Sequence, residues 1–233
     1  MRQRHGESEI SGIVSLAEPQ RLKLYRLVAN AEGSVSRDEA AQALGIAKSV
    51  AAFHLDRLEA DGLLEAEFRR PEGRGGPGAG RPTKRYRRSG REFAVSVPER
   101  QYAFAASLMA QAITRTREEN IPVDQALNEA AAAAGSALGA QALTLLAGGE
   151  TDGSSQAAVR AVLDEFGYET TAAAGQITLR NCPFRQLADQ DTELVCGMNL
   201  RFIEGLLDAV GDPRLRARLE PSEECCCVPI STG

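Results

Sequence analysis

Apolar side chains recur every three or four positions along the first 60 residues, which is the spacing of amphipathic helices. The pattern predicts three helices, at residues 19–30, 36–44 and 47–60. Ser36 and Glu39 form a Ser-x-x-Glu capping box at the start of the second helix, and Gly45 ends that helix. A tight turn containing Gly45 therefore separates the second helix from the third.

Two segments with strand character follow the three helices, at residues 63–69 and 83–88. Residues 70–82 lie between them and are rich in glycine and proline, which break helices and strands and so predict a loop. Three helices with a tight turn before the third, followed by a hairpin, are the layout of a winged helix-turn-helix.

The remaining sequence predicts a second part built mainly from helices. Helical spacing recurs at 98–119, 123–146, 155–166 and 193–210, and short strands are expected at 168–172, 176–180 and 226–230. We therefore expect an α+β fold that is mainly α, with three segments. These are a DNA-binding winged helix-turn-helix domain at 1–95, a helical dimerisation and connector region at 96–150, and an α/β sensor domain at 151–233.

Charge divides along the same boundary. The chain has 233 residues and a net charge of −5, but residues 1–100 sum to +4 and residues 101–233 to −9. A basic part joined to an acidic part suggests that one part binds a polyanion and the other does not. No apolar run approaches the roughly 20 residues of a membrane-spanning helix. The first ten residues lack an apolar signal core, which favours a cytoplasmic protein.

The third predicted helix is the candidate recognition helix. Ala51, Leu55 and Leu58 share the face expected to be buried, so the opposite face is free to enter the major groove of DNA. Lysine and serine can bond base edges or phosphates, alanine and phenylalanine can touch thymine methyls, and an arginine further along can hold a phosphate. The candidate DNA-binding residues of this helix are Lys48, Ser49, Ala52, Phe53, His54 and Arg57.

Each of these residues also has an ordinary structural interpretation. Lys48 and Arg57 taken alone are typical solvated charges. Phe53 can instead pack under the hairpin, and His54 is more typical of a packed or phosphate-adjacent residue than of a metal ligand. The arrangement as a whole is more specific than any one of them.

The hairpin adds a strongly basic segment. Residues 69–91 contain nine Lys or Arg and one acid, Glu72, a net charge of +8. Phosphate contacts supply much of the affinity of such domains, and an arginine at the tip can enter a minor groove. A disordered basic linker is the alternative interpretation. The candidate DNA-binding residues here are Arg74, Arg81, Thr83, Lys84 and Arg85.

The segments 45–58, 62–64 and 80–86 resemble the ArsR-like winged helix-turn-helix regulators of bacteria. One departure is Ala47, where a serine or threonine usually caps the recognition helix; its absence weakens the cap by about 1 kcal/mol. The resemblance implies binding to double-stranded operator DNA as a homodimer, with the helix at 98–119 as the candidate dimer seam.

All five cysteines lie at or beyond Cys182, and none forms a Cys-x-x-Cys pair. Their odd number, without a signal peptide, argues against a disulfide framework and for a metal or redox site. The spacing disfavours a zinc ribbon or a thioredoxin motif. Cys196 is expected near a helix start, where the helix dipole favours the thiolate. The candidate metal ligands are Cys182, Cys196, Cys225, Cys226 and Cys227.

The cysteine region resembles the SufR-type iron–sulfur branch of the same superfamily in its Asn-Cys-Pro stretch, the later Val-Cys and the C-terminal cysteine. The triplet at 225–227 departs from a single C-terminal cysteine. The resemblance implies a repressor whose operator affinity is tuned by a [4Fe-4S] or [2Fe-2S] cluster. We expect Cys182 and Cys196 as ligands, with Cys226 or Cys225 preferred over Cys227 as the third.

Other interpretations of the cysteines stay open. Single cysteines are commonly buried as small apolar side chains, thiolates also bind Zn²⁺, and a reversible disulfide can join the triplet to Cys182 or Cys196. An enzyme is disfavoured, because the sequence has no Gly-rich phosphate loop and no Gly-x-Ser-x-Gly. A thiol oxidoreductase is the nearest enzymatic alternative, and it leaves the basic hairpin unexplained.

Overall fold

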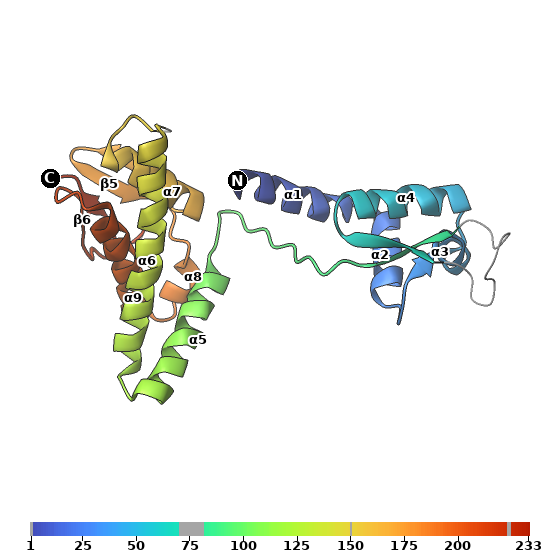
Figure 1. Ribbon diagram of the computed structural model, residues 1–233, viewed down its shortest axis with the longest axis horizontal. Coiled ribbons are helices and arrows are strands. Elements are labelled where there is room, and N and C mark those ends of the chain that lie inside the picture. The colour runs from blue at the N-terminus through green and yellow to red at the C-terminus, as the bar shows by residue number, and fades with distance from the viewer. Residues whose placement is uncertain (1, 70–81, 150, 223–224) are drawn as a thin grey trace. The chain divides into compact units, whose positions relative to one another are not determined.

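The computed structural model describes residues 2–69, 82–149, 151–222 and 225–233. The fold is α+β and mainly helical, with two small antiparallel sheets. The chain divides into two compact units, Met1–Val95 and Ser96–Gly233 (Figure 1). The segments expected at 96–150 and 151–233 therefore share one unit and one hydrophobic core.

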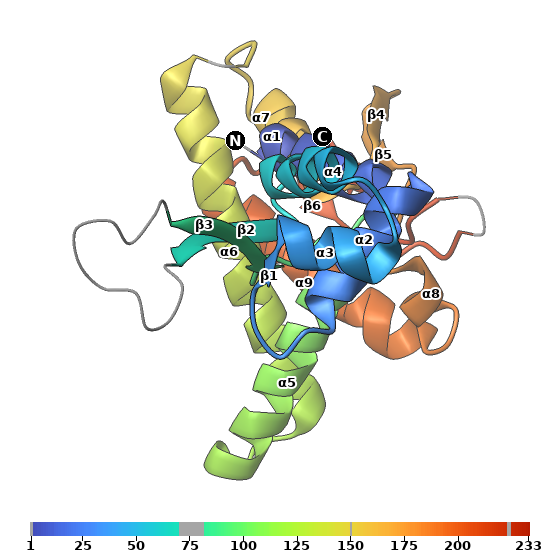
Figure 2. The same ribbon diagram turned by 90° about the vertical axis from the view of Figure 1, so that its right-hand side faces the viewer.

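Within residues 2–69 and 82–95, the first unit contains four helices and a three-stranded sheet. The helices are α1 (Arg2–Ser15), α2 (Pro19–Ala29), α3 (Arg37–Leu44) and α4 (Lys48–Ala60). The strands are β1 (Val35–Ser36), β2 (Leu64–Arg69) and β3 (Thr83–Arg88), in the antiparallel order β1-β3-β2 (Figure 2). The predicted helix, turn, helix and hairpin are confirmed, and residues 70–81 of the predicted loop lie outside the described residues.

Local sequence explains the boundaries of these helices. Ser36 and Glu39 form the predicted capping box, and Gly45 ends α3 in a left-handed conformation (φ 63°). Ala47 provides no side-chain cap for α4, as expected for alanine. The face of α4 that carries Leu55 and Leu58 is fully buried against α2 and the sheet. This packing leaves the opposite face of α4 outward.

Helix α1 and strand β1 were not expected from the sequence. The helix is held by long-range contacts, since Ser11 bonds the Asp61 carboxylate (3.5 Å) and Gly12 lies directly against the ring of Phe93. A Cβ on Gly12 would come within 2.3 Å of that ring, so the contact requires glycine or a shift of Phe93. Such contacts join positions far apart in the chain, so local sequence patterns cannot predict them.

The second unit contains five helices among its described residues. They are α5 (Tyr102–Glu119), α6 (Val123–Gly148), α7 (Ser155–Phe166), α8 (Arg185–Ala188) and α9 (Thr192–Val210). The sheet has the antiparallel order β4-β5-β7-β6, from β4 (Thr170–Ala173), β5 (Gln176–Leu179), β6 (Arg216–Ala217) and β7 (Ile230–Ser231). Helix α5 starts four residues later than expected, because residues 96–101 form no regular structure and residues 99–101 bond the loop at 181–183.

Helix α6 corrects one expectation from the sequence. It is long and apolar enough, by length and composition alone, to cross a membrane, and it is the one helix of the described chain with this property. Alanine and spaced leucines provide this hydropathy, so the sequence contains no conspicuous run of large apolar side chains. In the second unit, α6 packs against α5, α7 and α9 (Figure 1).

Glycines bring α6 and α9 into backbone contact. A Cβ on Gly135 would lie 1.8 Å from the carbonyl oxygen of Phe202, and one on Gly205 would lie 2.1 Å from that of Ala132. Any side chain at these positions would overlap a main-chain atom, which cannot rotate away. The two helices therefore depend on glycine for their spacing.

We expect Gly135→Ala to destabilise the second unit by at least about 3 kcal/mol, because the methyl group overpacks a backbone contact. Gly197→Ala in α9 is the matched control, since a Cβ there meets nothing within 4 Å, and it should stabilise the helix by about 0.5–1 kcal/mol. Denaturant unfolding followed by circular dichroism measures both. Equal effects of the two changes would contradict the close contact.

Candidate functional site

The predicted DNA-contacting residues on the outward face of α4 differ in their exposure and in their partners. Ser49 is exposed, and Phe53 is 66% exposed, so it does not pack under the hairpin. Ala52 is half-buried. Lys48 is exposed and forms a salt bridge with Asp38 (2.6 Å). The first turns of α4 thus combine a hydroxyl, a cation and an exposed aromatic ring.

His54 and Arg57 have partners within the first unit. The His54 ring lies edge-on to Phe53 (5.2 Å between centroids), and its Nδ1 is 3.7 Å from the Glu18 carboxylate. Most of its side chain is buried, which agrees with a packed histidine. Arg57 pairs with Asp61 one turn later (2.9 Å) while remaining half-exposed.

Asp56 joins the recognition helix to the hairpin and to α3. Its carboxylate accepts hydrogen bonds from Arg37 (2.5 Å), the Tyr86 hydroxyl (2.6 Å) and Lys84 (2.8 Å). Lys84 also pairs with Glu59. Lys84, predicted as a DNA contact, is therefore engaged inside the unit, where it holds β3 against α4.

The other predicted hairpin residues differ in their surroundings. Arg85 pairs with Glu39 (2.8 Å) and also bonds the Ser34 carbonyl oxygen, while Thr83 is exposed. Arg74 and Arg81 lie outside the described residues. Among the described hairpin positions, Thr83 is the predicted contact whose side chain is left most open.

The Asp56 contacts also shift pKa values. Burial raises the pKa of Asp56, but the hydrogen bonds from Lys84, Tyr86 and Arg37 outweigh it and lower the pKa to about 2. Burial and the bond to Asp56 raise the pKa of Tyr86 to about 12. The cluster therefore stays an ion pair with a neutral phenol throughout the physiological range.

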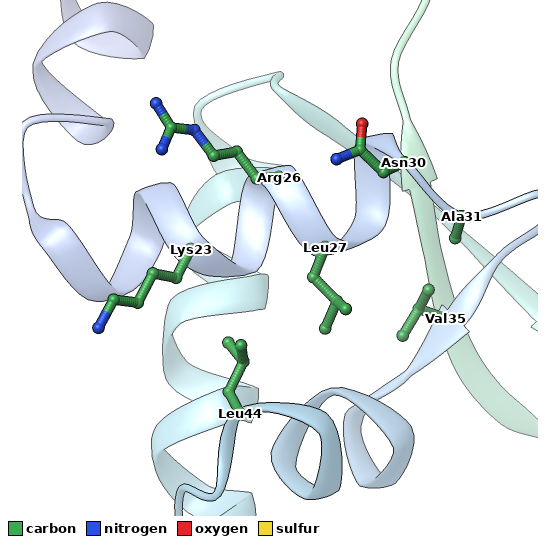
Figure 3. A pocket seen from close by; sticks show the side chains of 7 residues that line it. All are labelled: Lys23, Arg26, Leu27, Asn30, Ala31, Val35 and Leu44. Atoms are coloured by element: carbon green, nitrogen blue, oxygen red, sulfur yellow. The ribbon is translucent and has the colours of Figure 1, made fainter.

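A hollow of about 480 Å³ lies beside the helix-turn-helix, between α2 and α3 (Figure 3). Leu27, Val35 and Leu44 point into it, and Lys23 and Arg26 extend from its edge. The hollow is open, and it contains none of the residues predicted to contact DNA or metal.

The second unit brings four cysteines together from three distant segments. Cys182 follows β5, Cys196 lies in the second turn of α9, and Cys226 and Cys227 precede β7. The side chains of Cys182 and Cys226 are in contact, as are those of Cys196 and Cys227. These contacts do not include Cys225, which is half-exposed and whose backbone N–H bonds Ser222.

Local backbone contacts place these sulfurs. The Cys226 N–H donates to the Leu179 carbonyl oxygen (2.8 Å), which docks the C-terminal segment beside the end of β5. Cys182, Cys196 and Cys226 are buried, and Cys227 is partly exposed. The Asn199 amide, also buried, donates to the Cys226 sulfur (3.2 Å) and accepts from the Tyr168 hydroxyl (2.5 Å).

The pKa directions differ between the thiols. The bond from Cys226 and the Phe184 N–H lower the pKa of Cys182 to about 7, with Arg185 and Arg100 adding positive charge nearby. Burial and the neighbouring Cys227 raise the pKa of Cys196 to about 12. The expected thiolate stabilisation at the start of α9 is therefore wrong for Cys196, because desolvation outweighs the helix dipole.

Two residues important for these sites were missed from the sequence. Asp56 lies on α4 among candidate DNA contacts, and its partners come from α3 and β3. Asn199 is a polar residue on an apolar face of α9, between Val195 and Phe202, and that mismatch was a usable signal for a buried polar contact.

The comparisons with known proteins support the assignment of the first unit. Residues 16–67 match a family model described as a helix-turn-helix domain, of the ArsR winged type. A search of curated proteins and a search of solved structures each returned no significant match. The match spans α2, α3, α4 and the start of the hairpin, which are the elements that build the DNA-reading surface.

The first unit thus defines a DNA-binding transcriptional regulator of the helix-turn-helix class, and its binding partner is double-stranded DNA.

We expect the first unit to lose stability as the pH falls from about 4 to about 2, because Asp56 has a folded pKa below its unfolded value of 3.8 and must be protonated. Asp56→Asn should remove this acid sensitivity and cost about 1 kcal/mol at pH 7, a value limited by solvent screening since the carboxylate is 43% exposed. Thermal unfolding as a function of pH measures both effects. Glu65→Gln, which breaks an exposed pair with Arg87, is the control and should keep the acid transition.

Proposed function

We propose that this regulator is a cytoplasmic repressor whose operator affinity is set by an iron–sulfur cluster held at the cysteine site of the second unit. The observation that carries the proposal is the convergence of four thiols from three segments far apart in the chain. Cys182, Cys196, Cys226 and Cys227 are the residues that would hold the group.

The chemistry of the donor set fits such a group. All four donors are sulfurs, and thiolates are the usual ligands of iron–sulfur clusters. The backbone N–H groups of Phe184 and Val228 and the Asn199 amide already bond cysteine sulfurs, and such bonds tune clusters. The thiols stand in two hydrogen-bonded pairs. Among the described residues no three Cys, His, Asp or Glu side chains form a ready-made ion site, so binding requires rotation of the cysteine side chains.

When bound, the cluster would supply sensitivity to iron supply and to oxidants. The chain's own residues do the rest. Cys182, Cys196, Cys226 and Cys227 would hold the group, Asn199 holds the Cys226 sulfur, and the buried surroundings would exclude water from it. Since a ligand shifts an equilibrium only by binding two states differently, the loaded second unit must favour the DNA-binding state.

A thiol switch is the second candidate, favoured by the contact between Cys182 and Cys226. With hydrogen peroxide as oxidant, the two thiols would form one disulfide and two waters, with both electrons passing to the peroxide. A zinc site with the same thiolates is the remaining alternative.

We further propose that the regulator acts as a homodimer through α5. Ala105, Leu108 and Ala112 of this helix are buried, whereas Ala106, Ala110 and Ile113 form an exposed apolar face. A second copy of the chain can cover this face and place two recognition helices on neighbouring half-sites.

Anaerobically purified protein should contain iron and acid-labile sulfide in matching amounts, and Cys182→Ser and Cys196→Ser should each lose most of both. Cys225→Ser is the matched control, because Cys225 stands apart from the contacts between the other four, and it should keep the wild-type content. Metal analysis with the visible spectrum measures this outcome. Zinc alone, or metal-free protein that forms a Cys182–Cys226 disulfide with peroxide, would replace the cluster by one of the alternatives.

Phe53→Ala should weaken binding to an operator duplex about tenfold or more, because an exposed aromatic ring on the recognition helix loses its contact with the bases. Its unfolding free energy should change by less than about 0.5 kcal/mol, as for other exposed positions. Fluorescence anisotropy measures the affinity. Leu219→Ala, an exposed apolar truncation in the second unit, is the control, and an equal loss of affinity there would refute a specific contact by Phe53.

A further inference from the structure

The segment that follows the DNA-binding unit is hydrogen-bonded to the loop that carries Cys182. Residues 96–101 lead from the first unit into α5, and residues 99–101 contact residues 181–183. The Arg100 guanidinium donates to the Asn181 side-chain oxygen (2.5 Å) and to the Cys182 carbonyl oxygen (3.0 Å). The Gln101 N–H donates to the Pro183 carbonyl oxygen (3.0 Å).

The Asn181 side chain also donates hydrogen bonds to two backbone carbonyl groups. Its side-chain nitrogen donates to the Glu99 carbonyl oxygen (3.1 Å) and to the Gly167 carbonyl oxygen (2.5 Å). Asn181 is 7% exposed, so its side chain is largely shielded from water. A buried amide that satisfies its donors and its acceptor fixes its neighbours strongly, because leaving any of them unpaired is costly.

We use the word clasp for the hydrogen-bonded group formed by Glu99, Arg100, Gln101, Asn181 and the Cys182 carbonyl group. The clasp joins the backbone around Cys182, a candidate ligand, to the segment that leads covalently to the DNA-binding unit. These two segments are far apart in the chain. A change at Cys182 that moved the backbone at 181–183 would act directly on the hydrogen-bond partners of residues 100 and 101.

We propose that Arg100 and Asn181 are positioning residues that couple the state of Cys182 to DNA binding through this clasp. The proposal rests on the proposed function, since it requires that the cysteine site changes state. Binding of a group at the cysteine site changes the hydrogen bonds of the clasp. These bonds determine the conformation of residues 96–101. That segment determines which arrangements of the two DNA-binding units are available in the dimer.

The structure favours this route over one through the helices. Helices α6 and α9 are locked together by backbone contact at Gly135 and Gly205, so they move as one body. The clasp consists of hydrogen bonds between loops, which can exchange one partner for another where packed helix backbones cannot, as long as each buried polar group finds a new partner. It is therefore the element of the second unit best placed to have two arrangements.

The test compares operator affinity of full-length protein in two forms, loaded with iron and sulfide, and metal-free with reduced thiols. Allosteric couplings typically change affinity about 5–150-fold, and we expect the wild-type ratio in this range. In Arg100→Ala the ratio should fall below about twofold while iron and sulfide content stays at the wild-type level. Arg100→Lys keeps one donor and should restore part of the ratio.

Arg180→Ala is the matched control, because Arg180 adjoins Asn181 and is exposed, and it should keep the full ratio. Asn181→Ala is the second variant, read together with its thermal unfolding because the amide is buried. Hydrogen exchange of residues 99–101 adds a readout without DNA. Exchange there should differ between the loaded and metal-free wild type and be equal in the two forms of Arg100→Ala.

Three outcomes would overturn the proposal. If Arg100→Ala keeps the wild-type ratio, the clasp does not couple, and the proposed function still stands. If Arg100→Ala no longer holds iron and sulfide, the clasp serves assembly of the site instead. If the wild type holds a full complement of iron and sulfide but its affinity does not depend on them, the proposed function fails together with the clasp.

Discussion

The contact between the backbones of α6 and α9 is the constraint on which the second unit depends. Gly135 and Gly205 remove the side chains that would otherwise separate the two helices, so their main chains meet. Helix α9 carries Cys196 and Asn199, and the close contact fixes both with respect to the rest of the core. The sulfur of Cys226 is then held from α9 by Asn199. The geometry of the cysteine site thus starts from two residues that have no side chain.

The DNA-binding unit was largely predictable, because its signals are local. The capping box at Ser36, the left-handed Gly45 and the apolar face of α4 each act within a few residues and are read directly from the sequence. Helix α1 and the role of Lys84 were not predictable in this way. Both depend on partners 25 or more positions away, such as Asp61 for Ser11 and Asp56 for Lys84.

The sequence predicts which cysteines form the site, but it does not predict how their sulfur atoms are arranged. The sequence placed Cys182 after a strand and Cys196 near the start of a helix, and the structure confirms both positions. The triplet at 225–227 has no local signal that selects an inward sulfur. That choice follows from the bond between Cys226 and Leu179, which is a pairing across the sheet edge. The pKa of Cys196 likewise reflects burial, which the position along α9 does not reveal.

The ion pairs of the hairpin bear on how the protein searches a genome. Arg69, Lys84, Arg85 and Arg87 each pair with a carboxylate of the same unit, so much of the positive charge counted in the sequence is already neutralised. Each phosphate contact adds about 0.9 to the slope of log affinity against log salt. For any of these four side chains to bind a phosphate, it must first leave its carboxylate, and that exchange offsets part of the gain from counterion release.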